Sequence, residues 1–423
     1  MIRLKKLPNG IRVATEKIPS VSSCGIGLWV EVGSRHESDE ERGLTHFVEH
    51  MLFKGTPGRN ARQIADALNV LGGNANAFTS QEVLCLHART VAHKAHEALD
   101  LLAELLLEST FPEEEIPRER QVVLEEYKMY EDNPDDCSLD LFLRNLWPRD
   151  PLGRSVLGTR RTIGRFSREA LTEYWRRQFH PQRLLIAMAG SFDAAACGAV
   201  IRRRFEPLQA AGPPPPRPPA RHAIKARPRR TYLRRPVEQA HFCFGCLGPH
   251  RRSADRFAFG LMNMILGGGM SSRLFQEIRE KRGLAYSIGS FSQQFSDRGF
   301  FAVSGGTSIE SLGDVVKLTM EELARICEEN VPEAELVMAR EQVIDAMLMS
   351  QENTEARMMR MADSLLSTGR VMSLEEAVQR LRGVGAAEIR RTAAAHLRAV
   401  PLALGSIGPE GGAWPTAGPF QIA

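Results

Sequence analysis

The stretch His46-Phe47-Val48-Glu49-His50 contains two histidines four residues apart, with a glutamate directly before the second. Histidines at this spacing lie about one turn apart on one side of a helix, so both imidazoles can reach the same metal ion. Glu49 stands where its carboxylate can act as a base on water at the metal instead of binding the ion. The order H-x-x-E-H reverses H-E-x-x-H, and both orders are typical of zinc-dependent peptide hydrolysis. We therefore expect a zinc ion held by His46 and His50.

A catalytic zinc ion usually has three protein ligands, so a third must come from elsewhere in the chain. The segment Pro117–Pro134 offers Glu119 and Glu126, which are seven residues apart and share a helix face, with a pair of valines between them. Periodicity alone does not choose between Glu125 and Glu126 as the ligand. Surface glutamates on an acidic helix would produce the same pattern.

The two motifs together resemble the pitrilysin family of zinc metallopeptidases, in its processing-peptidase-like branch of half-length chains. The similarity lies in HFVEHMLFKGT (46–56) and RERQVVLEEYKMYEDNP (118–134), and it continues in GGNANAFTS (72–80), SSRLF (271–275) and RGLAYS (282–287). It therefore extends over essentially the whole chain. In this family the third zinc ligand follows the second histidine by about 76 residues, which implies Glu126 and one zinc ion per chain. A further family glutamate seven residues earlier implies that Glu119 supports the site.

The resemblance also assigns residues to the substrate. It implies that Asn76, Ala77 and Phe78 form a sheet edge to which an extended peptide adds as a strand. It implies that Arg279 holds the substrate carbonyl and that Tyr286 supports the oxyanion, both reaching across to the catalytic half. Without the family, the Gly-Gly-Asn-Ala turn would be structural, Arg279 a solvated helix residue and Tyr286 a strand residue packed in a core.

Composition places the chain among ordinary globular proteins. Its 423 residues carry 55 basic and 51 acidic side chains, and this balance gives no case for nucleic-acid binding. No run of eighteen apolar residues predicts a membrane span. The N-terminus lacks the apolar core of a signal peptide and the arginines of a transit segment, so we expect a cytoplasmic protein. Processing of the N-terminus stays open.

The cysteines predict reduced thiols, because their number is odd and they are scattered through a long chain. They are Cys24, Cys85, Cys137, Cys197, Cys243, Cys246 and Cys327. Cys243 and Cys246 form a C-x-x-C pair, but no second pair completes a zinc ribbon. We interpret them as buried strand cysteines.

A proline-rich stretch near residue 212 divides the chain. We expect a catalytic zinc-binding domain over 1–210, a Pro/Arg-rich linker over 211–230, and a homologous domain without metal over 231–423. The expected elements follow one plan in both halves: strand Cys24–Val32, the motif helix, helix Ala65–Leu71 and a strand near Asn76–Arg89, then strand His241–Leu247, a helix from Arg256, helix Leu274–Arg282 and strand Ala285–Ser292. This predicts an α+β fold of two homologous domains, each a mostly antiparallel sheet covered by helices, forming half of a clamshell-like chamber.

Alignment of the two halves predicts that only the first binds metal. When Gly72 is set against Gly283, the motif residues fall opposite Phe257, Gly260 and Leu261. A second alignment places Met347 opposite Glu126. The second half should therefore assist catalysis without a metal of its own.

These observations favour a zinc metalloendopeptidase that acts on peptides or unstructured segments, with Glu49 as general base. Because a half-length chain resembles half of a larger enclosure, we expect a homodimer, with a heterodimer containing a related subunit as the alternative. Two other functions compete: a non-catalytic or scaffold subunit of a peptidase-like complex, and a metal-dependent binding module that does not hydrolyse its ligand.

Overall fold

The computed structural model describes residues 2–210, 212–214, 229–398 and 400–409. Contacts between these residues divide the chain into two compact units, each built on one sheet. Residues up to 127, those between 154 and 214, and 349–371 belong to the first unit. Residues 128–153, those between 229 and 348, and those from 372 onward belong to the second unit.

The predicted linker, residues 211–230, lies mostly outside the described residues. Its last residue, Arg230, already belongs to a strand of the second unit. Two helices depart from the predicted halves, because residues 134–146 belong to the second unit and residues 354–368 to the first. The boundaries 1–210 and 231–423 therefore stay predictions. The contacts show in addition that each half of the sequence contributes one helix to the unit built mainly from the other half.

In the part of the chain that the structure describes, the first sheet has six strands. Their spatial order is β1 (Ile2–Lys6), β2 (Arg12–Lys17), β6 (Leu184–Gly190), β3 (Ser23–Val30), β5 (Leu84–Val91) and β4 (Ala75–Thr79). Neighbours are antiparallel except β2 and β6, which are parallel. The single strand expected near 76–89 is wrong: it is a hairpin, because the chain turns where the Ser80 N–H donates to the Val83 carbonyl at 2.8 Å. Strand β4 is thus an edge of the sheet.

Among the described residues, the second sheet repeats the order of the first and shows no counterpart of β1. Its order is β7 (Arg230–Arg234), β11 (Ala403–Gly408), β8 (Ala240–Gly248), β10 (Gly299–Thr307) and β9 (Ala285–Gln294). Only β7 and β11 pair in parallel, as β2 and β6 do in the first sheet. The predicted fold of two similar α+β domains with mostly antiparallel sheets is confirmed.

Helices cover both sheets. Those of the first unit are α1 (Leu44–Met51), α2 (Ala61–Val70), α3 (Ala95–Glu108), α6 (Arg160–Ile163), α7 (Arg168–Gln178), α8 (Ala194–Phe205) and α12 (Thr354–Thr368). Those of the second unit are α5 (Pro134–Leu146), α9 (Arg256–Gly267), α10 (Leu312–Glu328), α11 (Glu333–Met349), α13 (Leu374–Gly383) and α14 (Ala386–Leu397). Helix α4 (Ile116–Asp132) runs across the boundary at residue 127. The helix expected over 274–282 is a short π-helix, Phe275–Glu280.

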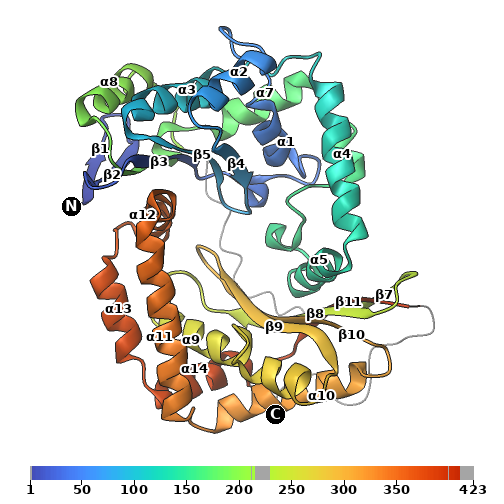
Figure 1. The fold of residues 1–423 in the computed structure, drawn as a ribbon. Coiled ribbons are helices and arrows are strands. Elements are labelled where there is room, and N and C mark those ends of the chain that lie inside the picture. The colour runs from blue at the N-terminus through green and yellow to red at the C-terminus, as the bar shows by residue number, and fades with distance from the viewer. Residues whose placement is uncertain (1, 211, 215–228, 399, 410–423) are drawn as a thin grey trace. The chain divides into compact units, whose positions relative to one another are not determined.

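The exchanged helices approach their sheets at glycines. Helix α5 lies against β11 and β8, and α12 lies against β3 and β6 (Figure 1). A Cβ atom at Gly405 of β11 would stand 2.3 Å from the Ser138 carbonyl oxygen of α5. A Cβ atom at Gly25 of β3 would stand 2.8 Å from the backbone of Glu355 in α12. Each glycine therefore lets a helix backbone come closer than any larger residue would allow.

Strand β3 is buried on both faces, which explains its apolar sequence. Ile26 and Leu28 pack in the core that contains α1 and α3. Trp29, on the opposite face, packs with Met358 and Leu365 of α12. The first sheet is therefore the middle layer of three, and α12 is one of the outer layers.

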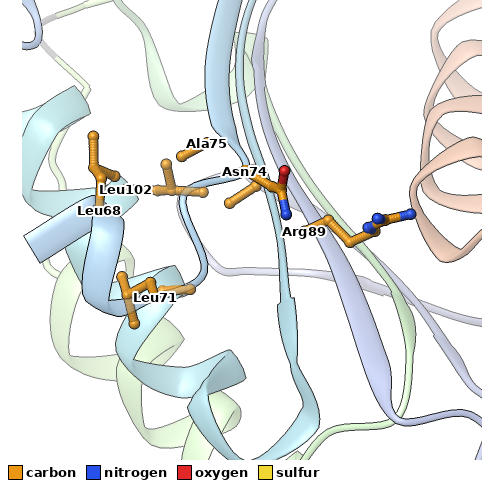
Figure 2. A pocket seen from close by; sticks show the side chains of 8 residues that line it. Leu68, Leu71, Asn74, Ala75, Arg89 and Leu102 are labelled. Carbon is orange, nitrogen blue, oxygen red and sulfur yellow. The ribbon is translucent and has the colours of Figure 1, made fainter. Parts of the chain in front are cut away.

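A small apolar cavity lies behind the start of β4. Figure 2 shows Leu68 of α2, Leu71 just after this helix and Leu102 of α3 around it, next to Asn74 and Ala75. Its volume is about 10 Å³, the room of a single water molecule. It is a packing defect beneath the edge strand, too small for a substrate.

The cysteines agree with the expectation of reduced thiols. All seven cysteines are free thiols, and Cys243 and Cys246 lie fully buried on β8. Among the described helices, none combines the length and the apolar character needed to cross a bilayer.

Candidate metal centre

Helix α1 carries the motif, and its start is held by a buried carboxylate. Gly43, just before the helix, has φ +88°, and a Cβ atom there would stand 2.4 Å from the Leu157 carbonyl oxygen. Because glycine has no side chain, another residue must satisfy the first N–H groups of the helix. Glu37 does so: its two oxygens accept hydrogen bonds from the N–H of Gly43 at 2.8 Å and of Thr45 at 2.7 Å.

The two sides of α1 have different roles. Phe47, Val48 and Met51 are fully buried in the core of the first unit. His46 is buried on another side of the helix, and His50 is half-buried. The rings of the two histidines are neighbours, with centroids 4.7 Å apart. The expected placement of both imidazoles on one side of a helix is therefore what the structure has.

Helix α4 presents its glutamates to α1. Glu119 and Val123 are buried on one face, and Glu126 follows on the same face. Both valines are expected on the helix face that Glu119 and Glu126 share. Val123 is buried there, whereas Val122 is 49 % exposed. The seven-residue spacing of the glutamates explains why both reach α1, since two helical turns return to nearly the same direction.

Three side chains converge where the two helices meet. Nε2 of His46 lies 3.6 Å from Oε2 of Glu126, and Nε2 of His50 lies 3.5 Å from the same oxygen. Neighbouring ligands of a tetrahedral zinc ion, with bonds of about 2.0–2.1 Å, lie about 3.4 Å apart. The donor set of two imidazole nitrogens and one carboxylate oxygen therefore fits zinc. Glu125 is instead hydrogen-bonded by Gln121, at 2.8 Å.

Burial and neighbouring groups shift the pKa values of the residues in this cluster. Burial and the nearby His50 together lower the pKa of His46 to about 4, against the raising effect of Glu126. Burial opposes protonation of His50, yet its hydrogen bonds to Glu119 and Glu126 raise its pKa to about 9. The hydrogen bond from His50 lowers the pKa of Glu126. Burial raises the pKa of Glu49.

Strand β4 carries the predicted substrate residues at the free edge of the sheet. Asn76 is exposed, Ala77 is buried and Phe78 is half-buried. The Ala77 N–H donates to Oδ1 of the neighbouring Asn76 at 2.9 Å. Phe78 packs edge-on against Trp29, with centroids 5.5 Å apart. Strand β4 is an edge strand in contact with α1, and the binding of an extended peptide there stays a prediction.

Arg279 and Tyr286 lie together in the second unit. The Arg279 guanidinium stacks 5.0 Å from the ring centroid of Tyr286 and 4.7 Å from that of Phe275. Tyr286 is 79 % exposed, so the alternative that it packs in a core is wrong. Arg279 also lines an open hollow of about 350 Å³, with Gly289 and Ser304 among the other lining residues.

Three residues near the motif were not singled out from the sequence. Glu37 caps α1, Lys54 lies 2.6 Å from Glu119, and Thr79 donates a hydrogen bond to Glu49 at 2.5 Å. Lys54 and Thr79 stand inside the quoted motifs, but their residue types do not distinguish them from other surface or strand residues. Only their contacts do.

Known proteins and family models match this chain along most of its length. Residues 12–160 match the family model described as insulinase (peptidase family M16), and residues 165–343 match that of the peptidase M16 inactive domain. The chain is 38 % identical to an uncharacterized zinc protease of Streptomyces coelicolor, over 96 % of this chain and 90 % of the relative. It is 36 % identical to an uncharacterized zinc protease of Bacillus subtilis, over 97 % and 99 %.

Solved structures share the fold. A protease from Helicobacter pylori superposes with a TM-score of 0.89 at 21 % identity, over 97 % of this chain and 99 % of that one. A peptidase M16 inactive domain from Pseudomonas fluorescens superposes with a TM-score of 0.86 at 21 % identity, over 98 % and 100 %.

Proposed function

The chain belongs to peptidase family M16, the pitrilysin family, and from this premise we propose that it is a zinc-dependent endopeptidase. Its substrates are peptides and unstructured protein segments. The convergence of His46, His50 and Glu126 carries the proposal, because these three donors lie within 4.8 Å of one another. The similarity to proteins named zinc proteases supports the choice of metal.

His46, His50 and Glu126 would hold one zinc ion per chain. When bound there, zinc supplies Lewis-acid chemistry: it lowers the pKa of water and polarises a carbonyl group. Glu49 accepts a proton from the attacking water and passes it to the leaving amine, a transfer commonly worth about 10²–10⁴ in rate. Burial of this carboxylate favours its protonated form and so suits a group that takes up a proton.

Strand β4 binds the substrate backbone in this proposal. A peptide added to a sheet edge gains main-chain hydrogen bonds whatever its side chains are. Asn76, Ala77 and Phe78 supply the edge, and the hydrogen bond between Asn76 and the Ala77 N–H would give way to the peptide. Recognition through the backbone explains why the substrates are extended segments instead of folded domains.

We also propose that Arg279 and Tyr286 of the second unit act on the bound substrate, as the family resemblance implies. Their guanidinium and hydroxyl groups are donors, and donors placed where negative charge develops stabilise the transition state. The exposure of Tyr286 and its stacking with Arg279 support this role, since the Tyr286 side chain is open to a ligand and holds Arg279 beside it.

Peptide turnover tests the proposal. Purified protein is incubated with a peptide mixture, with and without chelator, and the products are identified by mass spectrometry. The wild type should cleave internal bonds, lose activity with chelator and regain it with zinc. Glu49→Gln should keep its zinc and lose about 10²–10⁴ in rate, because an amide cannot accept the proton. A Glu49→Gln protein that cleaves at the wild-type rate would contradict the assignment of Glu49 as the base.

The alternatives leave different signatures in the same experiment. Zinc binding without turnover of any peptide would favour a metal-dependent binding module. A protein that neither binds zinc nor cleaves peptides would favour a non-catalytic scaffold subunit. The cytoplasmic location stays a prediction from the N-terminal sequence.

We propose a homodimer that encloses the substrate, because a chain of two domains resembles half of a chamber. Both the metal residues and Arg279/Tyr286 are present in this chain, so a different subunit is not required. Light scattering of the protein expressed alone measures its mass. An active monomer at working concentration would contradict the enclosure, and activity only after addition of a related subunit would favour the heterodimer.

A further inference from the structure

Strand β4 and helix α1 are joined by a hydrogen bond between Thr79 and Glu49. Oγ1 of Thr79 donates to Oε2 of Glu49 at 2.5 Å. Thr79 is the last residue of β4 and is half-buried. Among the described residues, no other group donates a hydrogen bond to this carboxylate. The proposed base is therefore held by the same strand that carries the proposed substrate edge.

The position of Thr79 is set by the hairpin that follows it. Thr79 pairs with Leu84 of β5, and the turn between them is closed by Ser80 and Val83. Because side chains alternate along a strand, Thr79 points to the same side as Ala77, which packs in the core containing α1. A slip of one residue would turn the hydroxyl to the opposite face of the sheet.

A glutamate beside a metal site needs such a restraint. Its side chain has several rotatable bonds, and Glu49 directly precedes His50 on α1. An unrestrained carboxylate near a divalent cation would be drawn toward the cation as a ligand and lost as a base. Threonine is a stiff partner, because its branched Cβ restricts the rotamer of the hydroxyl.

We propose that Thr79 is a positioning residue of the peptidase site, whose hydroxyl keeps Glu49 available as the base and ties it to strand β4. The inference rests on the proposed function. It adds that one strand sets both the register of the bound peptide and the place of the base, three residues after Asn76. The base and the peptide backbone then move together.

The test compares Thr79→Val with Thr79→Ser. Valine keeps the branched shape but cannot donate, while serine keeps the hydroxyl. With a peptide that the wild type cleaves, Thr79→Val should lower kcat about 10- to 100-fold, the scale for a hydrogen bond to a charged group. KM should stay within about twofold, because the lost interaction does not bind the ground state. Thr79→Ser should restore kcat to within about threefold of the wild type.

Thr90→Val is the matched control. Thr90 lies on β5, is buried, and donates its hydroxyl to the Leu71 carbonyl at 2.6 Å. The variant removes the same kind of hydrogen bond from the neighbouring strand and touches no residue of the site. It should lower the melting temperature and leave kcat unchanged.

Metal binding supplies a readout that does not depend on turnover. Zinc content and zinc affinity, measured by competition with a chelating dye, should not fall in Thr79→Val. A tenfold loss of zinc affinity would indicate a structural role and overturn the proposal. So would a Thr79→Val protein with wild-type kcat, or a Thr79→Ser protein as slow as Thr79→Val. If Thr79→Val does not fold, Thr79→Ala is compared with Thr79→Ser under the same criteria.

Failure of this inference is distinct from failure of the proposed function. A zinc-loaded wild type that cleaves no peptide would contradict both the proposed peptidase function and the positioning role of Thr79. An active wild type whose kcat is indifferent to Thr79 removes only the positioning role.

Discussion

Glu119 accepts a hydrogen bond from His50, with Oε2 of the carboxylate 3.1 Å from Nδ1 of the ring. Its other oxygen lies 2.6 Å from Nζ of Lys54. Burial disfavours a charged carboxylate, but the hydrogen bonds from His50 and Lys54 outweigh it and lower the pKa of Glu119. Since Nδ1 of His50 is engaged by Glu119, Nε2 is the nitrogen that faces Glu126, at 3.5 Å. Such partners orient a metal-binding histidine and fix its tautomer.

Removal of a proposed ligand should abolish stable zinc binding. His50→Ala and Glu126→Gln each leave two donors of the three, too few for a tight site. Metal analysis after dialysis should find about one zinc ion per chain in the wild type and far less in either variant. His93→Ala, at an exposed histidine, should keep its zinc. Undiminished zinc in His50→Ala would contradict the assignment.

Glu119 and Lys54 should act on zinc as one unit. Glu119→Gln weakens the acceptor for His50 and should reduce zinc affinity by about 10- to 100-fold. Lys54→Met should have a smaller effect, because it acts through Glu119. The double variant should resemble Glu119→Gln alone, since effects routed through one group do not add. Affinities from dye competition check this, and additive losses would mean that Lys54 acts independently.

Arg279→Ala and Tyr286→Phe should reduce kcat/KM by about one to three orders of magnitude, the scale for lost oxyanion donors. Zinc content should stay normal, because neither residue belongs to the ligand set. Arg282→Ala is the control, since Arg282 is a nearby arginine paired with Glu277. Full activity in both variants would contradict a role of Arg279 and Tyr286 in catalysis.

Glu37 should make stability depend on pH. Burial raises its pKa to about 7, against the lowering effect of the N–H groups of Thr45 and Gly43. In the unfolded chain a glutamate has a pKa of about 4.3, so the folded state binds the proton more tightly. The resulting stabilisation is fully present below about pH 4.3 and is lost as the pH rises through about 7, by at most about 1.4 kcal/mol per pH unit.

Glu37→Gln removes this titration. The free energy of unfolding of the wild type, relative to Glu37→Gln, should fall by about 3 kcal/mol between pH 5 and pH 8. Denaturant unfolding with chelator present measures the difference without a contribution from metal binding. Glu114→Gln, at an exposed carboxylate, should not change the pH profile. A constant difference between wild type and Glu37→Gln would contradict the raised pKa of Glu37.

The exchange of helices shows where sequence patterns lose information. The plan of strands and helices in each half could be predicted from periodicity and turn residues. That α5 would cover the second sheet and α12 the first could not, because an apolar helix face fits either sheet equally well. Gly405 and Gly25 mark the two contacts only once the helices are seen against them.

The sequence by itself determined what depends on local spacing: the two histidines on one side of α1, the glutamates two turns apart on α4, and the repeated plan of two α+β domains. A helix returns to the same direction at known intervals, so these relationships follow from residue numbers alone. Tertiary structure decided which groups hold the motif in place: Glu37 at the start of α1, Lys54 beside Glu119, and Thr79 on Glu49. These partners come from other turns and other elements, and periodicity carries no information about contacts that only the packed chain creates.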